Sequence, residues 1–503
     1  MAPLSAVVGL ALAFASAMPV MAASSSAVIC QSGSSELPVN EARVLAFGNY
    51  RGPTASQDSQ AQRFFDQGLV FGWGFNFPEA VRSFRAAARI DPACALCRWG
   101  VAWALGPSIN HEMRGEDRPL ALDAIVQARV YAEPRSRERA LIDALAARYE
   151  DANSDYSARA YASAMVVLAE QFAHDADIAV LAAEAMMNAH PYDYWASNGR
   201  PKSWTPQIMT LLDRALRIAP DHPGAHHYNI HLFEESREPK RALSSAEQLG
   251  ALAPIVGHLV HMPSHIYFRL GRYQQAVNAN QAAVDADRAY LAASGAQSGY
   301  AIHNLHFLWA SALRNGDSPT ALRVAEELAA ASSQMSDGLR QHLMAAPALT
   351  RVRFAQWDAI ATQPSPDHSP YLSGLMHFAR GMMHAARGDV GAARADLDSL
   401  QRSRRQTKAA GLTIKNINQA DDVLNVARLQ LQSAIARARG ANGEAIRQAH
   451  AAARAEDRLA ADDPPVWLIP SRRALAGLAA ERRLHPRLTS SSLSAQYVAP
   501  LSK

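Results

Sequence analysis

The sequence predicts an all-α fold in which successive helix pairs stack into a solenoid. Small and aromatic residues recur at fixed spacing between Phe65 and Pro92, and Pro220 and Pro254 lie 34 residues apart. The segments between the clear repeats show helical spacing of apolar residues and no strand-like runs. The chain has 503 residues, of which 49% are hydrophobic and 19% charged, so it can bury a large core.

The N-terminus predicts export. Residues Leu4 to Val20 are apolar, and Met21-Ala22-Ala23 supplies the small residues of a cleavage site. We therefore expect a signal peptide over residues 1–22, with cleavage near Ala22 or Ala23, and a periplasmic or secreted mature chain. No later apolar run reaches the roughly 18 residues that cross a bilayer, so we expect no membrane span after the signal is removed. Residues 23–60 are expected to be extended.

An oxidising compartment lets cysteines pair. The chain has only Cys30, Cys94 and Cys97, which predicts one disulfide and one thiol without fixing the pairing. Arg98 stands where a Cys-x-x-Cys motif that attaches haem has histidine, so this motif does not predict c-type haem. A buried disulfide or pair of thiols is the preferred interpretation.

The helices can be assigned in chain order. The first repeat places its residues at the spacing of a tetratricopeptide helix–turn–helix unit: Gly68, Phe71, Ala80, Phe84, Ala87 and Pro92. Three further helices are predicted, at Ser136–Tyr149, Tyr156–Phe172 and Ile178–Met187. Later turns begin at Gly271, Gly316 and Gly388, and the helices that follow them open around Ala276, Ala321 and Ala393.

Three histidine-rich segments carry a resemblance to a known group. Residues 224–231 (GAHHYNIH), 257–267 (GHLVHMPSHIY) and 303–307 (HNLHF) resemble the first helices of large exported bacterial tetratricopeptide proteins. The resemblance runs from about Phe64 to Arg473. It implies a right-handed α-solenoid, with a histidine-lined concave groove in a superhelix over residues 61–330 and further helices over 331–480. The end departs from the pattern of the group, because a Ser/Leu-rich tail, expected to be flexible over 481–503, stands where another helix pair would follow. The group has no established reaction, so no substrate is implied.

The histidines follow the repeat register. Counted back from Ala242, Ala276 and Ala321, which open second helices, seven of nine matched positions hold histidine. They stand eighteen, fifteen or eleven residues before these alanines: His227, His231, His258, His261, His265, His303 and His306. With 18 histidines in 503 residues, chance fills about 0.3 of nine positions. The spacing i, i+3, i+7 places them on one helix face.

This pattern predicts a metal site. Neutral imidazole binds metals, and helices packed about 8–10 Å apart let imidazoles of neighbouring helices converge. Glu234 and Glu235 follow His231 closely and are candidate carboxylate ligands or catalytic bases. The alternative is a groove whose histidines bind a peptide or protein partner, or sense pH.

Copper is the preferred metal, because the cluster is rich in imidazole and contains no thiolate. Six or seven histidines suffice for two ions with three ligands each, and such a pair would bind dioxygen and oxidise or hydroxylate a small organic substrate in the groove. The same site would support a zinc hydrolase with Glu234 or Glu235 as base, or a non-haem iron oxygenase with Glu234 as ligand. A binding module without enzymatic activity and a periplasmic metal-binding protein are the remaining alternatives.

Several other readings are disfavoured. Lys+Arg (50) nearly balances Asp+Glu (46) and no run of five like charges occurs, so nucleic acid is not an expected partner. Phosphate-loop, serine-hydrolase and zinc-protease motifs are missing from the sequence. His377 and His384 fall at packing positions, and an irregular turn argues against His342 as a ligand. The segment 462–467 (DDPPVW) is expected to be a rigid capping loop, or a lid over the groove.

Overall fold

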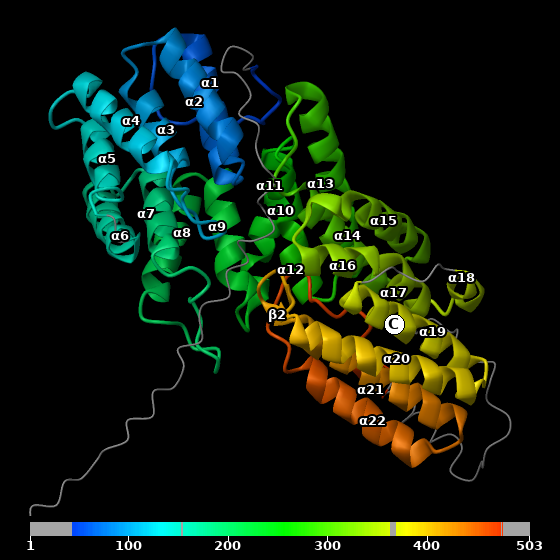
Figure 1. The fold of residues 1–503 in the computed structure, drawn as a ribbon. Coiled ribbons are helices and arrows are strands. Elements are labelled where there is room, and N and C mark those ends of the chain that lie inside the picture. Colours follow the sequence, from blue (N-terminus) through cyan, green and yellow to red (C-terminus); the bar gives the residue numbers. More distant parts are fainter. Residues whose placement is uncertain (1–42, 152–153, 363–368, 474, 476–503) are drawn as a thin grey trace, which may run out of the picture.

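The computed structural model describes residues 43–151, 154–362, 369–473 and 475. The predicted signal peptide, Cys30 and the tail over 481–503 lie outside these residues. Within them the chain forms 22 α-helices, two short 3-10 helices and one two-stranded sheet. Successive helices pack against one another along the molecule (Figure 1), which confirms the predicted all-α solenoid of helix pairs.

The first predicted repeat forms α1 (Ser59–Trp73) and α2 (Phe77–Ile90). Asp58 caps α1 by accepting hydrogen bonds from the backbone N–H groups of its first turn, and Asn76 caps α2 in the same way. Gly68 faces the Phe84 ring, where an added Cβ would lie 2.6 Å from a ring carbon. The small residue therefore lets the two helices pack closely.

The helices α3 to α8 complete the N-terminal part. Their bounds are α3 (Ala95–Ala104), α4 (Asp117–Tyr131), α5 (Arg137–Ala146), α6 (Ser154–Gln171), α7 (Ala176–Asn188) and α8 (Thr205–Ile218). The three helices predicted between residues 136 and 187 match α5, α6 and α7 to within a few residues.

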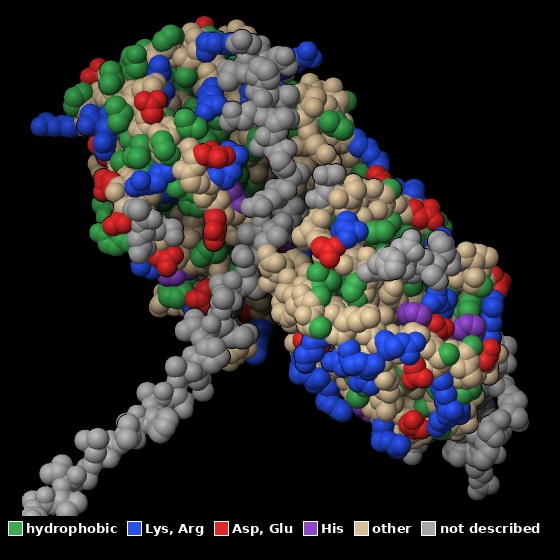
Figure 2. All heavy atoms as spheres, viewed as in Figure 1, with side chains coloured by type: hydrophobic (Ala, Val, Ile, Leu, Met, Phe, Trp, Pro, Cys, Tyr) green, Lys and Arg blue, Asp and Glu red, His purple; other side chains and the backbone are tan. Residues whose placement is uncertain are grey.

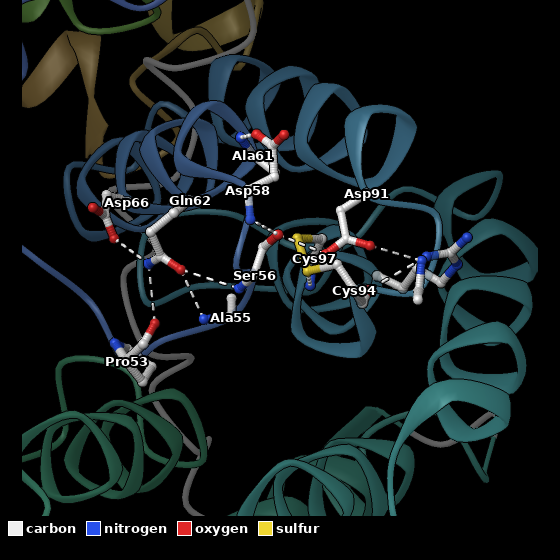
Figure 3. The surroundings of a disulfide bond; sticks show 12 residues. Pro53, Ala55, Ser56, Asp58, Ala61, Gln62, Asp66, Asp91, Cys94 and Cys97 are labelled. Atoms are coloured by element: carbon white, nitrogen blue, oxygen red, sulfur yellow. Dashed lines mark hydrogen bonds between the residues drawn. A yellow bond between two sulfur atoms is a disulfide. The ribbon is translucent and has the colours of Figure 1, made fainter.

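The predicted disulfide joins Cys94 to Cys97 at the start of α3 (Figure 3). Both cysteines are buried. Beside them the Ser56 hydroxyl donates a hydrogen bond to Asp91 at 2.5 Å, which ties the segment before α1 to the end of α2. The burial fits a structural bond.

The central helices carry the histidine-rich segments. Their bounds are α9 (Pro223–Glu234), η3 (Pro239–Ala242), α10 (Leu243–Leu252), α11 (Gly257–His261), α12 (Pro263–Arg269), α13 (Tyr273–Ser294), α14 (Ala301–Asn315) and α15 (Ser318–Ala331). Pro263 cannot donate a backbone hydrogen bond, and the helix is interrupted at Met262 between α11 and α12.

The C-terminal helices follow a similar plan. Their bounds are η4 (Ser332–Gln334), α16 (Asp337–Met344), α17 (Ala346–Arg353), α18 (Trp357–Ala361), α19 (Pro370–Ala386), α20 (Val390–Ala409), α21 (Ala420–Ala438) and α22 (Asn442–Glu456). A small antiparallel hairpin of β1 (Thr413–Ile414) and β2 (Asn418–Gln419) interrupts the helices and, with two isolated β-bridges, is the only β structure within the described residues.

Two large hydrophobic clusters form the core of the described residues. The first extends from Leu45 to Tyr300 and the second from Val277 to Leu468. Helix α13 supplies side chains to both clusters, Ala276 to the first and Val277 to the second. The histidine-bearing helices therefore lie where the two cores meet. The predicted boundary between residues 330 and 331 stays a prediction.

The surface is mixed in charge. On the face in Figure 2, Lys and Arg side chains gather over α20, where Arg402, Arg405 and Lys408 are exposed. Of the helices in the described ranges, none has the length and apolar character needed to cross a membrane.

Asp177 in α7 ties the N-terminal segment to the start of α9. Its carboxylate accepts a hydrogen bond from Tyr50 and lies 3.2 Å from His222 Nε2. Burial alone raises the pKa of Asp177, but hydrogen bonding and charge from His222, with the bond from Tyr50, outweigh burial and hold the pKa below its ordinary 3.8.

We expect Asp177→Asn to lower the free energy of unfolding by about 1–3 kcal/mol at pH 7. Because the pKa of Asp177 is lower in the folded than in the unfolded state, its ionised carboxylate stabilises the folded protein fully when the pH is above the unfolded-state pKa, near 3.9. This stabilisation is lost as the pH falls through the folded-state pKa. The gap between variant and parent, measured by urea unfolding, should therefore narrow below about pH 4. A gap that stays constant with pH would contradict this role.

Candidate metal centre

Six of the seven predicted ligands form two groups of three histidines. The first triad is His227, His231 and His258, and the second triad is His261, His265 and His303. In each triad one nitrogen from every ring lies within 4.8 Å of the other two. Each triad takes two histidines four residues apart along the chain and a third from the next histidine-bearing helix. Convergence between neighbouring helices, which the register predicted, is thus confirmed.

In the first triad, the hydrogen bond of His227 determines which of its two ring nitrogens carries the proton. Its Nδ1 lies 2.6 Å from the carbonyl oxygen of Trp73, which can only accept, so Nδ1 carries the proton. Its Nε2 then carries a lone pair instead of a proton, and this nitrogen lies 3.2 Å from His258 Nε2. His231 completes the triad, with an Nε2 that has no hydrogen-bond partner among the described residues.

The second triad is built the same way around His261. Its Nδ1 lies 2.6 Å from Asn280 Oδ1, and the Asn280 amide donates its own proton to the carbonyl of Ala276, which fixes the oxygen toward the imidazole. The bare Nε2 of His261 faces two more nitrogens, His265 Nε2 at 2.9 Å and His303 Nε2 at 3.0 Å. Three ring nitrogens that meet in this way suit a shared cation.

Glu234 connects the two triads. Its Oε1 lies 2.7 Å from His231 Nδ1, and its Oε2 lies 2.7 Å from His265 Nδ1. Both oxygens thus contact the far side of a ligand ring, where an acceptor orients a metal-binding imidazole. Glu234 is 3% exposed, whereas Glu235, the other predicted base, is exposed.

Burial controls the charge of most of these rings. It lowers the pKa of His227, His258, His261 and His303 well below 6.5, so these imidazoles are neutral and able to bind metal. His265 differs: burial lowers its pKa, but the carboxylates of Glu234 and Asp463 outweigh burial and raise it to about 10. Metal binding at the second triad must therefore release a proton.

Aromatic side chains enclose both triads. The Phe75 ring packs against all three rings of the first triad, with centroid distances of 4.6, 5.7 and 5.4 Å. Phe307 does the same in the second triad, at 5.0, 4.7 and 5.9 Å. The six histidines are at most 9% exposed. The rings are therefore buried, and the concave groove that they were expected to line stays a prediction.

The two triads adjoin each other. The ring centroids of His258 and His261 are 5.8 Å apart, and those of His231 and His265 are 6.4 Å apart. The two triads therefore share a boundary formed by these four rings.

The seventh predicted ligand, His306, lies outside both triads. Its ring neighbours that of His342, with centroids 6.1 Å apart, although the irregular turn of that repeat argued against His342 as a ligand. His226 is also buried, but its nitrogens contact Ser245 Oγ at 3.0 Å and the carbonyl of Pro220 at 2.7 Å. It belongs to no triad and is a natural control.

Asp463 is a site residue whose role the sequence did not reveal. It follows α22, and its carboxylate lies 3.5 Å from His265 Nδ1, so that Glu234, His265 and Asp463 form a third group able to hold a metal ion. A buried ion pair of Lys415 with Asp462, at 3.0 Å, anchors this loop. His265 would use Nδ1 in this group and Nε2 in the second triad, so for a neutral ring the two arrangements are alternatives.

The histidines expected at packing positions do pack. His377 Nδ1 lies 2.9 Å from Asp396, and His384 Nε2 lies 3.8 Å from the same carboxylate. These residues join α19 to α20 away from the triads.

No family model matches the chain, and no curated protein matches it. Among solved structures it is similar to yeast Tom70, at 10% identity and a TM-score of 0.31, over 86% of this chain and 91% of that one. It is also similar to the human IFIT1 dimer with PPP-AAAA, at 14% identity and a TM-score of 0.32, over 80% of this chain and 96% of that one. A third similarity is to the P58(IPK) TPR domain, at 10% identity and a TM-score of 0.22, over 86% of this chain and 100% of that one. These similarities concern the fold alone.

Proposed function

We propose that this protein holds one metal ion in each triad, as a dinuclear centre between the histidine-bearing helices. The observation that carries the proposal is that the two nitrogens of a ring have different partners. In His227 and His261, Nδ1 is bound to an acceptor of the protein, and Nε2 points at the other nitrogens of its triad. Acceptors on the far nitrogen are typical of histidines that bind metal.

Copper is the metal we propose. All six triad ligands are imidazoles, which suit copper, and copper stands highest in the general order of divalent affinities. We also propose that the chain is exported. Outside the cytoplasm, cellular thiols would not compete with these imidazoles for copper. When bound, two neighbouring copper ions would supply dioxygen binding and reduction. An oxidase would take the four electrons and four protons for two waters from its substrate, and an oxygenase would place one oxygen atom in the substrate and release the other as water with two further electrons and protons from the same substrate. We therefore propose a copper-dependent oxidase or oxygenase.

The chain itself supplies orientation and a dry environment. Trp73 and Asn280 hold the Nδ1 protons of His227 and His261, so their Nε2 lone pairs stay directed inward. Glu234 holds one ring of each triad and thereby fixes the two triads relative to each other. Phe75 and Phe307 keep water from the ring faces.

A metal-binding protein without turnover is the second candidate. It is favoured by the burial of the triads, because ligands at most 9% exposed offer a substrate little surface. The carboxylates of Glu234 and Asp463 beside His265 favour a harder ion, such as iron or zinc, if His265 binds through Nδ1.

Elemental analysis and oxygen uptake test these functions. The mature protein, purified from the exporting compartment without chelator, is expected to retain two copper ions per chain after gel filtration. It should then consume oxygen with at least one member of a panel of phenols. Two coppers without oxygen uptake on any member would favour the second candidate. Zinc or iron in place of copper would contradict the proposed metal, and no metal would overturn the dinuclear centre.

A further inference from the structure

The two triads obey one construction rule. Each begins with two histidines four residues apart, His227 and His231 on α9, or His261 and His265 at the α11–α12 break. Each ends with one histidine of the next histidine-bearing helix, His258 on α11 or His303 on α14. The ligand set thus moves along the solenoid by one repeat at a time.

The rule can be applied once more, from α14 to α16. The pair would be residues 306 and 310, and the closing histidine would lie on α16. His306 is present, Ala310 stands at the second place, and α16 carries His342. His342 precedes Pro347 by five residues, as the closing histidine of the first triad precedes Pro263 by five. In this third set of positions, two of the three therefore hold histidine, His306 and His342.

The two rings of this remaining pair are neighbours, and both are buried. The ring centroids of His306 and His342 are 6.1 Å apart, the same distance as between His265 and His303 in the second triad. His306 is 3% and His342 1% exposed, and the Nε2 of each has no hydrogen-bond partner within the described part of the chain. Buried nitrogens without a partner are costly unless something binds them.

Tyr371 fixes one of the two rings. Its hydroxyl oxygen lies 3.0 Å from His342 Nδ1 and, by accepting the Nδ1 proton, would leave the Nε2 lone pair free for a metal. Burial lowers the pKa of His342 to about 3 and that of His306 well below 6.5, so both rings are neutral. The nearby ammonium of Lys415 is neutralised by Asp462 at 3.0 Å.

We propose that His306 and His342 bind a third metal ion through their Nε2 atoms. Two imidazoles suit the cuprous ion, which accepts two ligands, better than zinc, which in structural sites takes four. Because Ala310 supplies no ligand, this ion is held less tightly than those in the triads. The inference takes its construction rule from the proposed triads, but the residues that test it are different.

The test is an anaerobic titration of the chelator-stripped full chain with cuprous ion against a coloured competing chelator. The parent protein is expected to bind three ions, and both His306→Ala and His342→Ala are expected to bind two. His226→Ala, a buried histidine outside the rule, should still bind three. His227→Ala should lose an ion from the first triad and keep the third one. Circular dichroism checks that each variant is folded.

Two further variants keep the proposal testable if an alanine variant unfolds. Ala310→His completes the set and should tighten the third ion at least about tenfold, and Tyr371→Phe should weaken the same ion about tenfold. Equal stoichiometry in the parent and His342→Ala, with no effect of Ala310→His, would overturn the third position while leaving the triads intact. Loss in His342→Ala without any loss in His227→Ala or His261→Ala would instead support the pair and overturn the proposed dinuclear function.

Discussion

Replacing His261 with alanine is expected to remove one of the two tightly held ions and to abolish oxygen uptake. The His261 Nε2 lies within 3.0 Å of both other nitrogens of the second triad, and without it only two imidazoles remain, which hold an ion less tightly than three. Orienting residues alone change metal affinity about 10–100-fold, and loss of a direct ligand should cost at least about 100-fold. Chemistry that needs two neighbouring ions should fall to background.

The measurement is metal content after dialysis against a competing chelator, with oxygen uptake on the same samples. After this dialysis, which removes the more weakly held third ion, His261→Ala should retain one ion in the first triad, and the parent should retain two. Two controls separate metal loss from a general packing defect. His226→Ala removes a buried histidine of α9 whose nitrogens are bonded elsewhere, and His377→Ala removes one that pairs with Asp396. Both should keep two ions, and full metal content in His261→Ala would rule out the second triad.

Glu234→Gln is expected to weaken metal binding at both triads at once. The carboxylate contacts His231 Nδ1 and His265 Nδ1 at 2.7 Å each, and both contacts need an acceptor. Glutamine offers one acceptor oxygen and one N–H₂ donor, so one of the two rings loses its acceptor and the other loses a negative partner. We expect affinity to fall about 10–100-fold at each triad.

Competition with a chelator of known affinity measures both losses. Glu235→Gln is the matched control, because it makes the same change at the next residue, which is exposed. The control should bind like the parent. If Glu234→Gln weakens only the second triad, the carboxylate acts with Asp463 on His265 alone and does not couple the triads. Unchanged affinity at both triads would show that Glu234 orients neither ring.

A repeat architecture explains how such a site is built. Each helix pair presents the same register positions to the next pair, so one histidine pattern is copied along the solenoid. Two complete copies of the pattern form the triads, and in the next register Ala310 stands at the position that holds His231 and His265 in the triads. The number of metal positions is then set by how many repeats keep the pattern.

The helices and the ligand register could be predicted from the sequence because both depend on short-range periodicity. A spacing of i, i+3 and i+7 fixes a common face whatever the rest of the chain does. The glycine and aromatic positions of the first repeat likewise fix close helix packing, as Gly68 against Phe84 shows. Six of seven histidines chosen in this way meet in the triads.

Only the tertiary structure decided which histidines share a centre and what holds them. The carbonyl of Trp73 and the carboxylate of Asp463 come from segments far from their histidine partners along the chain, whereas Asn280 follows His261 by 19 residues, a separation that recurs at His226–Ser245 and His377–Asp396. Burial of the rings likewise depends on how two hydrophobic cores meet at α13. A repeat pattern specifies which face a side chain occupies, whereas its partners and its exposure depend on every element packed against that face.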